Sequence, residues 1–279
     1  MIEPLEQAFM QRALAEVILV GFAGGALGCW VVFYGLSYAA ESLAHALFPG
    51  LVIAAIAGVP LLFGAVPAIV IAALAIAAAS RIAGVTRDVA VAVVVTTMFG
   101  LGVLLALSPQ SPPGIETLLF GDLFGPTDVD LATAAGLAVA VGIALWLLHG
   151  RLLTAGFDRA AARSLGVSPA LADAALLILL AAGIVVAVQG LGNLLVVAVF
   201  VGPAAAASRL TERMAPMMLL AAALAALAGI AGLYLSYYAG TAGGASVALA
   251  IVAAYLVSLP LGRLALRPGR RASAEATIV

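Results

Sequence analysis

Residues 61–80 read LLFGAVPAIVIAALAIAAAS, a run that contains no charged side chain. A helix of about 20 apolar residues is long enough to cross the hydrocarbon core of a bilayer. The run is continuously apolar, whereas the strands of a membrane barrel would alternate apolar and polar residues. This stretch therefore predicts a transmembrane helix.

Similar runs on both sides of it predict nine spans, with an uncertainty of about one. The predicted spans are 16–34, 38–59, 61–80, 88–108, 131–149, 170–189, 192–208, 215–238 and 246–266. Polar residues and Gly or Pro interrupt 38–59 and 170–208, which leaves the number of spans open there. The fold class is all-α. We expect one transmembrane domain over 1–279, a polytopic integral membrane protein with about eight or nine transmembrane helices, some of them broken.

The composition agrees with a membrane protein and excludes several other classes. Hydrophobic residues make up 65% of the chain and charged residues 9%, against ~45–50% and ~25% in soluble domains. The net charge of −1 offers no basic surface for nucleic acid. No phosphate-binding loop of the form GxxxxGK[ST] occurs, so the chain does not hydrolyse ATP by that route. The first fifteen residues are acidic rather than basic, which argues against a cleaved signal peptide.

Charged loops suggest an orientation in the membrane. Arg residues gather in 81–87, 150–169, 209–214 and the C-terminal end, whereas 109–130 is acidic and 239–245 carries no charge. Because Lys and Arg mark the cytoplasmic side, the first group is predicted to be cytoplasmic and the other two loops external. The side of the N-terminus stays open. The polar tail 267–279 is predicted to be disordered and cytoplasmic.

Glu41 and His45 are the clearest ionisable pair inside a predicted span. Their spacing of four places both side chains on one face of a helix. A carboxylate and an imidazole form a plausible half-site for a divalent transition-metal ion, and such groups at membrane depth are functional candidates. A purely structural pair of the two side chains is the alternative. The single cysteine, Cys29, cannot form an internal disulfide or a thiolate cluster.

Two further features attract attention. Pro49-Gly50 and Gly202-Pro203 predict broken or kinked helices, and broken helices often line the binding cavities of transporters. The segment 157–166 is polar and helix-prone, with Asp158 able to cap it and Gly166 able to end it. It suits either a docking helix for a cytosolic partner or a simple surface loop.

These pieces together resemble one family, the membrane permeases of bacterial ABC importers for zinc, manganese and iron ions. No single piece is specific, but their order and spacing are. The stretches that carry the resemblance are 9–14, 41–50, 119–123 followed by Asp130, 157–166, 196–207 and 232–237.

The resemblance implies a division of labour in the bacterial plasma membrane. Two permease copies would form a homodimeric pathway for a zinc, manganese or iron ion, with no permanently bound cofactor. A pair of cytoplasmic ATPase subunits would dock on the coupling segment, and an external metal-binding protein would deliver the ion. The residues implied for the metal are Glu41 and His45, and those for the ATPase are Phe157, Asp158, Arg159, Arg163, Leu165 and Gly166.

Other functions remain open at this point. A permease for a bulky chelate, such as a siderophore, would need a wide apolar cavity instead of an ion-ligand pair. A stand-alone secondary transporter could use Glu41 as a proton relay. An intramembrane enzyme is disfavoured because no nucleophile–base pair is visible.

Overall fold

The computed structural model describes residues 6–265, and the predicted tail 267–279 lies outside them. This part of the chain is helical, with eight helices long and apolar enough to cross a membrane. These eight are α1 (Ala8–Phe33), α2 (Ser37–Ala57), α3 (Leu61–Ala79), α4 (Arg87–Ala106), α6 (Asp128–Phe157), α8 (Pro169–Leu191), α10 (Met214–Ala239) and α11 (Gly243–Ala265). Three shorter helices are α5 (Thr117–Phe120), α7 (Arg159–Ser164) and α9 (Val196–Ser208).

The predicted span 192–208 is the one that the structure does not show as a spanning helix. Helix α9 has 13 residues and is therefore about 20 Å long, which is short of the ~30 Å hydrocarbon core. Gly192 has a φ of 78° and lies between α8 and α9. The apolar run is thus divided into an irregular connection and a short helix, which hydropathy alone does not separate.

Two helices, α1 and α6, are much longer than their predicted spans. Helix α6 begins at a reciprocal cap, in which Thr127 and Asp130 each accept a hydrogen bond from the other's backbone N–H. It continues through Arg151 to Phe157, beyond the most apolar part of the segment. Helix α1 begins at Ala8, and its Arg12 forms an ion pair with Asp128 at 3.0 Å. Hydropathy marks the part of a helix that suits lipid, so it misses such polar ends.

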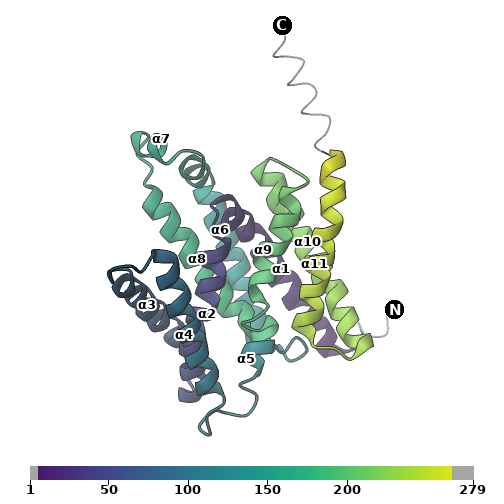
Figure 1. The fold of residues 1–279 in the computed structure, drawn as a ribbon. Coiled ribbons are helices and arrows are strands. Elements are labelled where there is room, and N and C mark those ends of the chain that lie inside the picture. The colour runs from purple at the N-terminus through teal and green to yellow at the C-terminus, as the bar shows by residue number, and fades with distance from the viewer. Residues whose placement is uncertain (1–5, 266–279) are drawn as a thin grey trace.

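The helices form two groups that meet along a seam (Figure 1). One group contains α2, α3 and α4, which pack on one another. In the other, α1 packs against α6, α9 and α10, and α11 packs against α9 and α10. Small residues on α1 let its neighbours approach closely; the Gly28 backbone, for example, lies against Phe200 of α9. Contacts of α2 with α8 and α9 are sparse by comparison, so the seam is the thinly packed part of the bundle.

The short helices α5 and α7 mark opposite ends of the bundle (Figure 1). Helix α5 lies in the acidic connection between α4 and α6. Helix α7 lies between α6 and α8, where the sequence predicted a short polar helix. We use the names "α5 end" and "α7 end" for these two ends below.

Candidate metal site and coupling segment

His45 lies on α2 at the seam between the two helix groups. Its Nδ1 is 3.3 Å from Oδ1 of Asn193, in the connection between α8 and α9. Its ring lies 4.6 Å from the ring of Phe99 on α4. The half-buried imidazole is therefore held from both sides of the seam by groups far away in the sequence.

Asn193 decides which nitrogen of His45 is available. This fully buried side chain donates a hydrogen bond from Nδ2 to the carbonyl of Ala44 at 2.7 Å. Its carbonyl oxygen then faces His45, and this oxygen can only accept, so the proton belongs on Nδ1. In a neutral imidazole this tautomer has its lone pair on Nε2, the nitrogen that could then bind a metal ion.

Glu41 lies one helical turn before His45 and is exposed in the single chain. On α2 the two side chains share a face, as their spacing predicted. Among the described residues, no three His, Cys, Asp or Glu side chains come close enough together to hold a metal ion. At this candidate site, one chain therefore offers one acid and one imidazole among its described residues.

The two predicted helix breaks are not helix ends. Helix α2 continues through Pro49, and α9 continues through Pro203. Pro49 nevertheless has a consequence for the site, because it has no N–H and stands four residues after His45. The backbone carbonyl of His45 therefore lacks the N–H that would normally donate to it in a helix, and this carbonyl belongs to the same residue as the imidazole.

The glycines beside these prolines are explained by packing. A Cβ on Gly50 would collide with the backbone oxygen of Gly64, at the crossing of α2 and α3. A Cβ on Gly202 would meet Cγ2 of Ile251 on α11. Both positions allow two helices to approach closely, which is a role the sequence reading did not assign to them.

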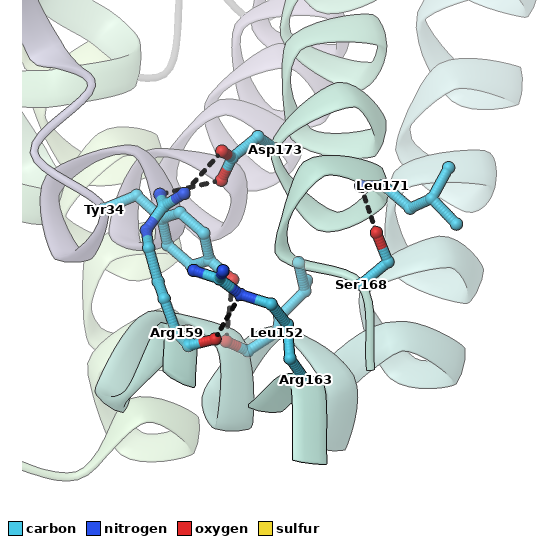
Figure 2. A network of polar contacts seen from close by, with 7 residues as sticks. All are labelled: Tyr34, Leu152, Arg159, Arg163, Ser168, Leu171 and Asp173. Carbon is cyan, nitrogen blue, oxygen red and sulfur yellow. Dashed lines mark hydrogen bonds and ion pairs between the residues drawn. The ribbon is translucent and has the colours of Figure 1, made fainter. Parts of the chain in front are cut away.

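The predicted coupling segment, residues 157–166, lies at the α7 end, and its polar contacts are drawn in Figure 2. Asp158 caps α7, with Oδ1 accepting hydrogen bonds from the backbone of Ala160 at 2.7 Å and Ala161 at 3.0 Å. The N–H groups of Ala161 and Ala160 stabilise the carboxylate and lower the pKa of Asp158 from its ordinary value. Gly166 ends the segment with a φ of 76°, a conformation that glycine adopts without strain.

Ion pairing ties α7 to α8. Arg159 binds both carboxylate oxygens of Asp173, at 2.8 and 3.0 Å, and Arg163 donates to the carbonyl of Arg159 at 3.1 Å (Figure 2). A two-point guanidinium–carboxylate contact fixes orientation as well as distance.

The groove between the two arginines and the start of α8 has a volume of about 540 Å³. Phe157 and Leu165 flank α7 and are 81% and 71% exposed. The segment is thus a capped helix tied to α8, with a groove beside it and uncovered apolar side chains.

Residues 6–262 match the sequence profile of the ABC 3 transport family. The chain belongs to this family. It is a multi-pass membrane permease of an ABC importer, and a separate ATPase subunit hydrolyses the ATP.

Two similar proteins illustrate the range of relatives. The "Manganese transport system membrane protein MntC" of Halalkalibacterium halodurans is 34% identical over 257 residues, which cover 91% of this chain and 87% of the relative. The "Probable iron transport system membrane protein" of Haemophilus influenzae is 30% identical over 267 residues, covering 96% and 98%. A solved structure, "PsaBC from Streptococcus pneumoniae in complex with Fab", matches with a TM-score of 0.87 and 28% identity, over 92% of this chain and 93% of that one.

The sequence reading missed three partners of the predicted residues in this permease. The sequence does not mark Asn193 as a partner of His45, yet its side chain is buried against that residue. Phe99 and Asp173 were not singled out, yet they contact His45 and Arg159. In the sequence, Asn193 stands out only as a polar residue beside Gly192, and Asp173 only as an acid within an apolar run. Neither feature identifies a contact partner more than ten residues away.

Proposed function

We propose that this permease carries a divalent transition-metal ion, manganese or iron, and that Glu41 and His45 bind the ion during its passage. The relatives described above are named for manganese or iron, which narrows the three metals of the sequence resemblance to two. An imidazole with a carboxylate suits transition-metal ions better than Ca²⁺ or Mg²⁺, which prefer oxygen ligands alone.

The observation that carries this proposal is the contact between His45 and Asn193. It orients the ring and favours the tautomer with a proton on Nδ1, which in a neutral imidazole leaves Nε2 to bind the ion. A histidine present only to satisfy a buried carboxylate would point at Glu41. Glu41 is exposed and stands free to supply the second ligand.

A second copy of the chain completes the pathway in this proposal. The half-site is open on the side of Glu41, and a transported ion needs further ligands from water or from another subunit. A symmetric homodimer would supply them from the same face of its own α2. An external metal-binding protein would deliver the ion to the α5 end.

The fold suggests how ATP hydrolysis could reach the ion. Docking of the ATPase pair on α7 moves Asp173 through its ion pair with Arg159, and Asp173 is part of α8. The other end of α8 leads directly to Asn193, which holds His45 across the seam. A shift of α8 relative to α2 would thus change the ligand geometry and release the ion on the α7 side, as alternating access requires.

Uptake in living cells tests the proposed function. The permease and its partner ATPase are expressed in bacteria that lack their own manganese importers, and entry of radioactive Mn²⁺ is measured. We expect uptake of the bare ion that stops when the ATPase is inactivated by mutation. Uptake that persists without ATP hydrolysis would indicate a stand-alone transporter, and uptake of iron only as a siderophore complex would indicate a chelate permease. Either result would contradict the proposal.

A further inference from the structure

A second polar cavity lies at the α5 end of the bundle, apart from Glu41 and His45. Its volume is about 180 Å³, room for about six water molecules. Three carboxylates line it: Glu16 of α1, Asp122 of the α5–α6 connection and Asp130 of α6. Gln189 of α8 adds an amide, and no Lys, Arg or His is among the lining residues.

Glu16 is the decisive residue in this cavity. Its side chain is 3% exposed, and its Oε2 is buried without a hydrogen-bond partner. A buried charge without a partner is costly inside a membrane protein. The nearest basic side chain along α1, Arg12, pairs with Asp128 instead.

The neighbouring acids increase that cost. The charges of Asp130 and Asp122 both act unfavourably on the carboxylate of Glu16. Asp130 is held in place, because its Oδ2 accepts hydrogen bonds from the backbone N–H of Thr127 at 2.8 Å and from its hydroxyl at 2.6 Å. The backbone N–H of Asp122 donates to the carbonyl of Gln189 at 3.2 Å. The fold thus fixes three acids around one cavity that has no basic side chain in its lining.

We propose that this cavity binds a divalent cation that keeps part of its water shell. The donors are oxygen atoms, which hard divalent ions such as Ca²⁺ and Mn²⁺ accept. The carboxylates are too far apart to hold a bare ion directly, since no such group of three occurs among residues 6–265. The cavity has room for the water molecules that would bridge them. This site is independent of the proposed transport through Glu41 and His45.

Manganese binding to the purified permease–ATPase complex tests this site. All variants carry His45→Ala, which removes the imidazole of the first site, and free Mn²⁺ is followed by electron paramagnetic resonance during titration. We expect about one bound ion per permease chain, which Ca²⁺ displaces because the site has only oxygen donors. Glu16→Gln keeps the size of the side chain but removes its charge, and we expect it to weaken binding at least about tenfold.

Two further variants make the result decisive. Asp122→Asn lies on a connection outside the helices, so it tests the cavity even if Glu16→Gln disturbs folding, and we expect a similar weakening. Glu116→Gln removes an exposed acid of the same α4–α6 connection and should leave Mn²⁺ binding unchanged. Equal Mn²⁺ affinity with and without Glu16→Gln or Asp122→Asn would overturn the proposal. Absence of any bound Mn²⁺ in the His45→Ala parent would do so too, because Glu16 would then be neutralised by a proton.

Discussion

Replacing His45 with alanine is expected to reduce the initial rate of Mn²⁺ or Fe²⁺ uptake at least about 100-fold. Loss of groups that merely orient a ligand weakens metal binding about 10–100-fold, and His45 is proposed to be the ligand itself. The variant removes the imidazole without creating an unpaired charge. Radioactive metal uptake, normalised to the amount of permease in the membrane, measures the effect.

The chain offers a matched control, because it contains only one other histidine. His149 on α6 packs its ring 5.4 Å from the ring of Trp30, within the other helix group. His149→Ala should therefore keep most of the uptake while losing the same kind of side chain. If His45→Ala transports as well as His149→Ala, the assignment of the metal ligand is wrong.

A second large effect is expected at the α7 end, where Phe157→Asp combined with Leu165→Asp should abolish association with the ATPase. Both side chains are mostly exposed and contribute little to the bundle itself. Apolar residues at the centre of an interface often contribute about 2 kcal/mol or more each, and each 1.4 kcal/mol is tenfold in affinity. Co-purification of the permease with a tagged ATPase measures the loss.

Val129→Asp is the control for this pair. Val129 is 70% exposed on α6, at the α5 end of the bundle, and therefore lies away from any partner of α7. Like each substitution of the pair, it introduces one carboxylate at similar exposure, and it should leave co-purification intact. Normal association of the double variant with the ATPase would show that the coupling surface lies elsewhere.

Much of the fold follows from the sequence because lipid imposes a simple rule. An apolar run such as 61–80 must satisfy its backbone hydrogen bonds internally in lipid, which requires a spanning helix. Helix α3 covers nearly the same residues. Hydropathy predicts helix ends less well where a segment is surrounded by other helices instead of lipid. Glycine and asparagine at 192–193 divide one apolar run, and no hydropathy window detects that.

The candidate site was predictable only in part. Glu41 and His45 are visible because ionisable residues are rare in such a chain and their spacing is helical. Asn193 is 148 residues away from His45, and only the packing of α8 and α9 against α2 brings it there. The acidic cavity around Glu16 escaped the sequence reading for the same reason, since its three acids come from three different segments.

Pulsed electron paramagnetic resonance of Mn²⁺ bound to the purified permease–ATPase complex tests the central claim most directly. The method detects nitrogen atoms bonded to manganese, and the chain has only two imidazoles. We predict a signal from one imidazole nitrogen that persists in His149→Ala and disappears in His45→Ala. A nitrogen signal that survives His45→Ala, or bound Mn²⁺ without any nitrogen signal in the unmodified protein, would contradict the claim that His45 binds the transported ion.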